Sequence, residues 1–293
     1  MSRLLIIGAW DYARATLTQE EFCRTIGISR TSLWRYLKPE CNKRCSAVRK
    51  VCSKRAGWQE TAKRLAQRYP TYGYRRLYVL LKKQGIAAGQ HSLRRWMRAE
   101  GLSQQGIVID TGRTVGDRPA EPDGPNVAWQ IDATKIYTNC DGWIWQTSVL
   151  DVFNREVVGC VVRKTCRAED AQDALALALD ARLGMSRATG LSVIHDRGSQ
   201  FTSFSFKEMV ERCGAKNVTT AVRHPQSCGR LERFHRTLKE ELIWQQEWED
   251  LAEVGAAVEQ WLRFYNEERP HSALGYQSPL EFSAAATLQK QAA

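Results

Sequence analysis

A segment rich in glycine and proline, residues 103–125, divides the sequence into two parts with different patterns. Upstream of it, apolar residues recur at helical spacing; downstream, runs rich in Val, Ile, Trp and Thr alternate with short turns, as is typical of strands. The interrupting residues are Gly106, Gly112, Gly116, Pro119, Pro122, Gly124 and Pro125. Because such residues in a polar setting interrupt helices and strands alike, we predict a linker and a domain boundary here.

Charge is distributed unevenly along the chain. Residues 1–120 hold 24 Lys and Arg against 8 Asp and Glu, whereas residues 121–293 hold 19 against 24, and the whole chain carries +11. A solvated basic surface is one explanation of the first block. A basic region beside a neutral-to-acidic one more often marks a nucleic-acid-binding module, which is what we predict for it.

Composition excludes several other classes of protein. With 43% apolar and 26% charged residues, the 293-residue chain can bury a sizeable core and is not a disordered polyelectrolyte. It has no run of about 18 apolar residues and no secretory signal, so we expect a soluble intracellular protein without a membrane partner. Its nine cysteines are then expected to be reduced thiols. Cys41, Cys45 and Cys52 lack the paired spacing and the nearby histidine typical of zinc sites.

Two short helices separated by a turn are predicted for residues 17–38. Thr18 begins the first, Gly27 ends it, and Ser29 caps the second. This is a helix-turn-helix layout, although any two-helix corner of a bundle shares it. In that layout the second helix offers hydrogen-bond donors to a major groove, namely Arg30, Thr31, Ser32 and Arg35. A Lys- and Arg-rich connector, residues 42–57, completes a first segment that we place at residues 1–58.

A second helical unit is predicted for residues 59–102, with helices over 59–68, 74–84 and 90–100. The third helix places Arg94, Arg95 and Arg98 on its surface. Two interpretations of this helix are open: it binds DNA, or it presents a basic face to solvent. The neighbouring basic segments favour DNA binding.

An α/β domain is predicted after the linker, over residues 126–246. Three antiparallel strands come first, at 127–137, 143–152 and 156–163. A helix near 168–184, a strand at 191–195, a helix near 204–213, a strand near 217–222 and a helix from about 230 follow. This order describes a mixed five-stranded sheet with helices on its faces, followed by a C-terminal helix and tail at 247–293.

Three acidic residues occupy distinctive places in this outline. Asp132 interrupts the first strand, where aspartate is unfavourable. Asp196 stands at the end of the fourth strand, where ligands gather in α/β sheets. Glu232 lies on the flank of the last helix, beside the apolar stripe.

If these acids converge, they repel each other by about 1 to 4 kcal/mol per pair at about 4 Å, and divalent cations remove that repulsion. Two magnesium ions held by carboxylates activate an attacking oxygen and stabilise a leaving one, and a nucleic-acid backbone suits both such a site and the basic region. Taken singly, Asp132 is also explained as a buried structural acid, Asp196 as a helix cap, and Glu232 as a surface glutamate like Glu240 and Glu241.

Residues 126–282 resemble the catalytic core of DDE-type transposases and retroviral integrases, which have a ribonuclease-H-like fold. The resemblance lies in the stretches Trp129–Thr134, Leu150–Arg155, His195–Phe201 and Pro225–Phe234, and in the 35 residues between Asp196 and Glu232. More narrowly, Pro70–Arg76 and the tail 264–279 resemble bacterial insertion-sequence transposases of the OrfB type. Two departures are Cys228, where many relatives have Asn or Gln, and the absence of a leucine zipper.

The resemblance implies roles for individual residues. Asp132, Asp196 and Glu232 bind two magnesium ions, which manganese can replace. Water nicks the end of the element, and the resulting 3′-hydroxyl attacks a second phosphodiester without a covalent protein intermediate. Asp151 is expected to be a structural acid, and His195 to pack or orient rather than act as a base, because the metals supply that function. DNA contacts are expected at Gln226, His235 and Lys239, and at Arg75 and Arg76 of the upstream motif.

The expected partners are double-stranded DNA, as terminal inverted repeats and target, and further copies of the chain assembled on it in the bacterial cytoplasm at the nucleoid. The tail at 269–276 is expected to dock against the core or a partner subunit. Three functions stay open at this point: an active transposase, a DNA-binding regulator derived from one, and a metal-dependent nuclease that does not transfer strands.

Overall fold

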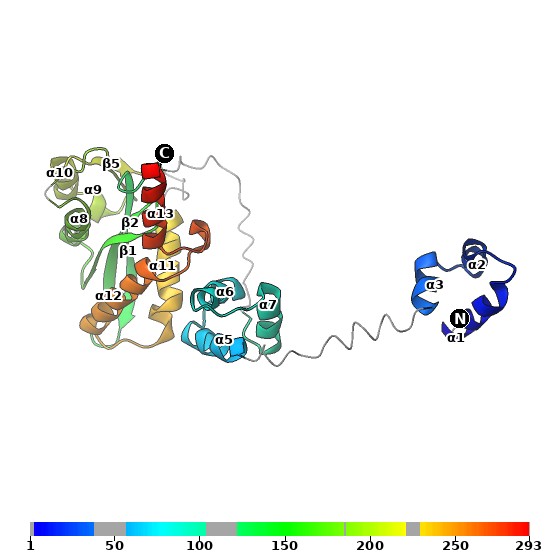
Figure 1. The fold of residues 1–293 in the computed structure, drawn as a ribbon. Coiled ribbons are helices and arrows are strands. Elements are labelled where there is room, and N and C mark those ends of the chain that lie inside the picture. Colours follow the sequence, from blue (N-terminus) through cyan, green and yellow to red (C-terminus); the bar gives the residue numbers. More distant parts are fainter. Residues whose placement is uncertain (1–2, 38–56, 104–121, 185, 221–228, 293) are drawn as a thin grey trace. The chain divides into compact units, whose positions relative to one another are not determined.

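The computed structural model describes residues 3–37, 57–103, 122–184, 186–220 and 229–292 (Figure 1). The chain forms two compact units, Met1–Thr61 and Ala62–Ala293. Among the described residues, no helix is long and apolar enough to cross a bilayer. The described cysteines, which are Cys23, Cys140, Cys160, Cys166 and Cys213, are all free thiols. The cluster at Cys41, Cys45 and Cys52 lies outside the described residues.

The first unit contains three short helices, α1 (Arg3–Ala13), α2 (Gln19–Ile26) and α3 (Arg30–Leu37). The helix pair predicted for residues 17–38 is confirmed. Thr18 and Glu21 form a capping box at the start of α2, and Gly27 ends that helix at φ 72°. Helix α1 was not predicted. It supplies Ile6 and Trp10 to the core of the unit, because two helices of eight residues each bury too little apolar surface on their own.

A second group of helices consists of α5 (Gly57–Arg68), α6 (Tyr74–Lys83) and α7 (Gln90–Ala99), close to the predicted bounds. Leu77 and Leu81 of α6 and Leu93 and Met97 of α7 are buried where these two helices meet. The apolar face is therefore set by the spacing of four residues along each helix.

A five-stranded sheet in the order β3-β2-β1-β4-β5 forms the centre of the second unit. Its strands are β1 (Ala128–Thr138), β2 (Gly142–Asp151), β3 (Val157–Arg163), β4 (Ser192–His195) and β5 (Lys216–Thr219). The first three strands pair antiparallel, whereas β4 and β5 run parallel to β1. This confirms the predicted mixed sheet.

Helices cover both faces of the sheet (Figure 1). One face packs against α8 (Ala168–Leu183), the short α9 (Ser199–Thr202) and α10 (Phe204–Arg212). The other packs against α11 (Gly229–Glu241) and α12 (Leu251–Glu267). Side chains alternate along β1, so Trp129 and Ile131 enter the first layer and Ile136 enters the second.

Gly159 of β3 allows α8 to approach the sheet closely. A Cβ atom at this position would lie 2.3 Å from the carbonyl oxygen of Ala174 and 2.9 Å from the Cβ of Ala178. The face of α8 that meets the sheet is accordingly rich in alanine.

The C-terminal segment folds back onto the second layer. Helix α12 contacts β3 and the final helix α13 (Pro279–Ala292). Two short 3₁₀ turns, η3 (Ile243–Gln245) and η4 (Ser272–Leu274), join these helices to their neighbours. The tail at 269–276 therefore docks on the core of its own chain, which was one of the two expected arrangements.

Candidate active site

Asp132 lies in the middle of β1, half-buried on the face covered by α11. Its Oδ1 accepts a hydrogen bond of 2.8 Å from the backbone N–H of Ala133, and its Oδ2 lies 3.7 Å from Nδ1 of His235 on α11. The parallel register pairs Ala128 with Ser192 and Gln130 with Ile194. Continued by two residues, that register brings Asp132 level with Asp196.

Asp196 follows the last residue of β4 and is exposed. Its Oδ1 accepts a hydrogen bond of 2.8 Å from the N–H of Gly198, which fixes the turn. His195 is fully buried; its Nδ1 lies 2.5 Å from the carbonyl oxygen of Asp196, and its Nε2 lies 2.6 Å from Oδ1 of Asn217 on β5. These contacts agree with the packing and orienting role expected of His195.

Glu232 lies in the first turn of α11 and is exposed. The helix start is tied to the sheet by two hydrogen bonds. The N–H of Leu231 donates to Oε1 of Gln130 over 3.2 Å, and Nη1 of Arg230 donates to the carbonyl oxygen of Val152 over 2.9 Å. Since Gln130 is two residues from Asp132 on the same face of β1, the first bond sets Glu232 close to that aspartate.

The electrostatics of Asp132 reflect the three acids together. The pKa of its carboxyl group is raised to about 6, chiefly by burial and further by the charges of Asp196 and Glu232, while the hydrogen bond from the Ala133 N–H and the charge of Lys239 act in the opposite direction. The three carboxylates thus lie within electrostatic reach of one another. Within the described ranges, however, no group of three or more His, Cys, Asp or Glu side chains is close enough together to hold a metal ion.

His235 and Lys239 of α11 flank the acids. His235 is buried, and burial lowers its pKa to about 3, so its 3.7 Å contact with Asp132 is not an ion pair at neutral pH. Lys239 is half-buried and its charge lowers the pKa of both neighbours, Asp132 and His235. Both residues were expected near DNA together with Gln226, which lies outside the described residues; these contacts with DNA stay predictions.

The upstream residues predicted to contact DNA are mostly exposed. In the first unit these are Arg30 and Thr31, while Ser32 is half-buried and its N–H donates to the Ser29 hydroxyl, which caps α3. Arg35 lies in the last turns of α3. Exposed arginines of the second helical group are Arg75, Arg94, Arg95 and Arg98.

Arg76 differs from these arginines because it is partly buried against the core. Its Nη1 lies 3.3 Å from Oε1 of Glu241, and its guanidinium lies 5.1 Å from the centre of the Tyr72 ring. The position therefore has a structural partner, and its contact with DNA stays a prediction.

Several supporting residues were not indicated by the sequence. Gln130, which anchors α11, lies two positions from the more conspicuous Asp132 in the same strand. Glu241 resembled a surface glutamate but has a side chain only 6% exposed, because Arg269 from the tail covers it. Asp151, expected to be structural, is buried and accepts hydrogen bonds from the N–H groups of Asn126 and Phe153.

Comparison with known proteins gives three family matches. Two models described as integrase core domains match residues 122–225 and 214–279, and a model described as an HTH-like domain matches residues 59–107. The integrase core matches begin at the end of the predicted linker, at residue 122, and include all three acids.

Relatives in bacterial mobile elements match most of the chain. It is 28% identical to an uncharacterized 31.7 kDa protein of insertion element IS407 from Burkholderia multivorans, over 92% of each chain. It is 29% identical to the putative transposase of IS986/IS6110 from Mycobacterium tuberculosis, over 77% of this chain and 86% of the relative. It is also 29% identical to transposase InsD of insertion element IS2 from Escherichia coli, over 73% of each chain.

Solved structures that match part of the chain include retroviral integrase cores. The catalytic core domain of BIV integrase has 24% identity and a TM-score of 0.42, over 57% of this chain and 99% of that one. The HTLV-2 integrase core, solved in complex with magnesium, has 20% identity and a TM-score of 0.43, over 55% and 97%. The sheet and its flanking helices are ribonuclease-H-like, as the sequence resemblance implied. With an HTH-like domain, an integrase core and insertion-sequence relatives along most of its length, the chain belongs to the integrase-core family of DNA transposases.

Proposed function

We propose that Asp132, Asp196 and Glu232 hold two magnesium ions, and that the enzyme uses them to cut the ends of an insertion sequence and to join those ends to target DNA. The observation that carries this proposal is that the charges of Asp196 and Glu232 act on Asp132 in the middle of the central strand β1. Asp132 and Glu232 stand on regular elements that a hydrogen bond joins, and Asp196 stands in a turn fixed by Gly198.

The donor set fits magnesium, which prefers oxygen ligands and is usually held by a few carboxylates together with substrate phosphate. The charges of Asp196 and Glu232 add to the effect of burial in raising the pKa of Asp132, and divalent cations would offset that repulsion between carboxylates. When bound, such ions supply activation of the attacking oxygen and stabilisation of the leaving one.

Each step of the proposed reaction forms one phosphorus–oxygen bond and breaks another. In cleavage, a water oxygen attacks phosphorus at the end of the element and the bond to the 3′-oxygen breaks, leaving a 3′-hydroxyl. In joining, that hydroxyl attacks a target phosphodiester and displaces a second 3′-oxygen, so one phosphodiester is exchanged for another without an external energy source. The chain orients the strand for this displacement rather than supplying a nucleophile, because no covalent step is needed.

Neighbouring side chains have supporting roles in this proposal. His195 is buried between Asp196 and Asn217, so it positions the turn and does not exchange protons with substrate. His235 stays neutral and holds the flank of Asp132. Lys239 places a positive charge where the strand approaches the acids, and thereby favours a phosphate there.

The helical units upstream would bind the element ends. We propose that Arg30, Thr31, Ser32 and Arg35 enter a major groove and that Arg94, Arg95 and Arg98 contact backbone or bases, with several copies of the chain assembled on two ends. Exposure of the α7 arginines supports this assignment.

The test is a cleavage and joining assay. Purified full-length protein is incubated with labelled duplexes carrying candidate element ends and Mg²⁺, and the products are resolved at nucleotide resolution. We expect Asp132→Asn, Asp196→Asn and Glu232→Gln each to abolish both steps while end binding persists. The matched control is Glu208→Gln, an exposed glutamate on α10, which should keep full activity.

The outcomes separate the candidate functions. Nicked ends without joined products would replace the proposal by a nuclease, and binding without any Mg²⁺-dependent product would replace it by a regulator. Full strand transfer by any of the three variants would refute the triad. A second readout is thermal stability: Mg²⁺ should raise the melting temperature of the wild type and of Glu208→Gln, and raise it less in each triad variant.

A further inference from the structure

An arginine-lined cleft of about 370 Å³ lies on the flank of α11, beside the face that carries Glu232. Its walls come from the start of α6, the turn after β2, helix α11, the end of α12 and the tail around η4. The charged lining residues are Arg76, Arg155, Arg230, Arg233, Arg236 and Arg269, against Glu240 and Glu241. The cleft thus has an excess of four positive charges, although all of its arginines except Arg76 come from residues 121–293, the part of the chain that is acidic as a whole.

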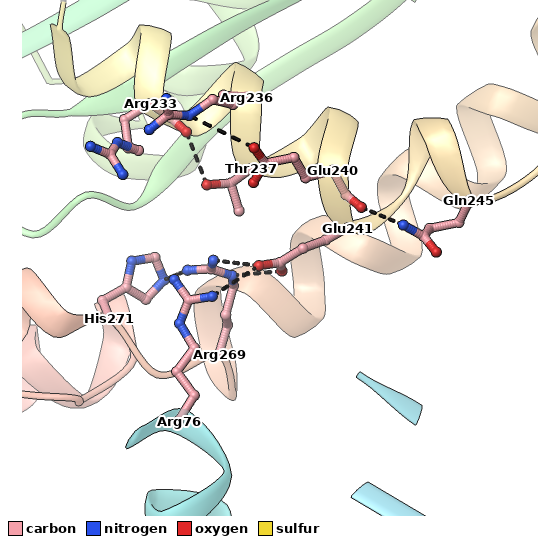
Figure 2. A network of polar contacts seen from close by, with 9 residues as sticks. All are labelled: Arg76, Arg233, Arg236, Thr237, Glu240, Glu241, Gln245, Arg269 and His271. Atoms are coloured by element: carbon pink, nitrogen blue, oxygen red, sulfur yellow. Dashed lines mark hydrogen bonds and ion pairs between the residues drawn. The ribbon is translucent and has the colours of Figure 1, made fainter. Parts of the chain in front are cut away.

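The floor of the cleft is an ion cluster around Glu241 (Figure 2). Arg269 binds its carboxylate with two hydrogen bonds, 2.6 Å from Nη2 and 2.8 Å from Nε, and Nη1 of Arg76 lies 3.3 Å from the same group. His271 adds no charge, because burial and the neighbouring guanidinium of Arg269 lower its pKa to about 3. One carboxylate therefore faces two guanidiniums, and the floor stays positive.

The rim of the cleft is more exposed. Arg233 and Arg236 project from α11 in Figure 2, and Arg236 approaches Glu240 at 3.9 Å with both side chains about half exposed. An exposed ion pair at that distance is weak, so Glu240 offsets the positive charge of the rim only slightly. A concave surface lined by one sign of charge focuses its potential, and guanidinium forks match the oxygens of a phosphate.

Helix geometry connects this cleft with the acids. Successive residues of an α-helix are rotated by about 100°, so Arg233 lies on the flank adjacent to Glu232, and Arg236 lies about one turn further along. A DNA strand that crosses the start of α11 at Glu232 therefore passes over the rim of the cleft. A small inorganic anion has the same chemistry, but it would not explain why the guanidiniums line the path away from the acids.

We propose that this cleft binds backbone phosphates of the DNA strand that flank the phosphodiester cut at the three carboxylates. The proposal rests on the proposed function for the path of the strand. Its contacts are to the backbone, so it holds and orients the strand without reading sequence.

The test is DNA binding in EDTA, measured by fluorescence anisotropy at several salt concentrations, with Asp132→Asn as the background so that no chemistry occurs. Arg233→Gln with Arg236→Gln should weaken binding roughly tenfold or more at low salt. The slope of log Kd against log salt should fall by about one for each phosphate that the variant no longer binds, equally for element-end and scrambled duplexes. Glu240→Gln should tighten binding, since it removes a negative charge from the rim.

The matched control is Arg212→Gln with Arg263→Gln, which removes the same charge from two exposed helical arginines outside the cleft. Arg263 is paired with Glu259 at 3.7 Å, much as Arg236 is with Glu240. If both double variants had the same Kd and salt slope, the cleft proposal would be overturned. A loss limited to one duplex sequence, or displacement of DNA by inorganic phosphate at the same concentration for both variants, would also overturn it. Because this binding assay involves no catalysis, a negative result would not contradict the assignment of the three acids. Conversely, a triad variant that kept its activity would not contradict the binding result.

Discussion

Glu241→Gln should destabilise the second unit strongly although the residue lies far along α11 from the acids. The Glu241 side chain is 6% exposed and that of Arg269 is 3% exposed, and two short hydrogen bonds join them. Removing the carboxylate charge leaves the Arg269 guanidinium buried without its counter-ion. Such a loss typically costs about 3 to 5 kcal/mol. Arg76, whose side chain is 28% exposed, should contribute about 1 kcal/mol or less to the same cluster.

The measurement is equilibrium denaturation in urea, followed by tryptophan fluorescence, with Glu240→Gln as the neighbouring control. Glu240 is about half exposed, so its variant should lie within about 0.5 kcal/mol of wild type. A second comparison is the double variant Glu241→Leu with Arg269→Met, which removes both charges and should recover much of the loss. The reasoning would be refuted if Glu241→Gln were no less stable than Glu240→Gln, or if the double variant lost the sum of its two single effects.

Three further predictions concern the framework of the site. Gly159→Ala should lower the unfolding free energy by about 1 to 3 kcal/mol, because its Cβ would meet the Ala174 carbonyl at 2.3 Å; an unchanged melting temperature would contradict the close packing of α8 on β3. Gln130→Leu should leave the Leu231 N–H without its acceptor, cost about 1 to 3 kcal/mol and slow cleavage more than end binding; equal cleavage rates in single-turnover assays would show that this bond does not position Glu232. Burial lowers the pKa of His271 to about 3, below its value in the unfolded chain. The unfolding free energy should therefore be highest above about pH 6.5 and fall as the pH drops towards 3, by at most about 5 kcal/mol. His271→Asn should flatten that pH dependence in denaturation curves, and a pH profile identical to that of the wild type would contradict this reasoning.

Local pattern predicted most of the secondary structure, for physical reasons that act over a few residues. The capping box at Thr18, the left-handed Gly27 and the turn at Asn139–Gly142 fix where elements begin and end. Alternation in β1 and the spacing of Leu77 and Leu81 in α6 mark the buried faces. Helix α1 was missed because its short apolar run has meaning only once it packs on α3.

The three acids were predicted by their setting and by the resemblance, not by their proximity. Each one has a plausible structural explanation in isolation, and the interval from Asp196 to Glu232 says nothing about distance in space. Proximity depends on the parallel register of β1 with β4 and on the hydrogen bond from Leu231 to Gln130, which joins residues 101 positions apart.

By itself, the sequence determined the α/β class, the basic helical region and the order of the strands along the chain, because these follow from propensity, periodicity and charge. Only the tertiary structure decided which charged side chains are buried and which partners they pair with. Glu241 and Arg76 looked like surface residues, yet they join Arg269 from the tail in one cluster, while Glu240 beside them stays exposed. Burial and long-range pairing depend on how distant elements pack, and a carboxylate in an exposed helical position has the same local pattern as one beneath a folded-back tail.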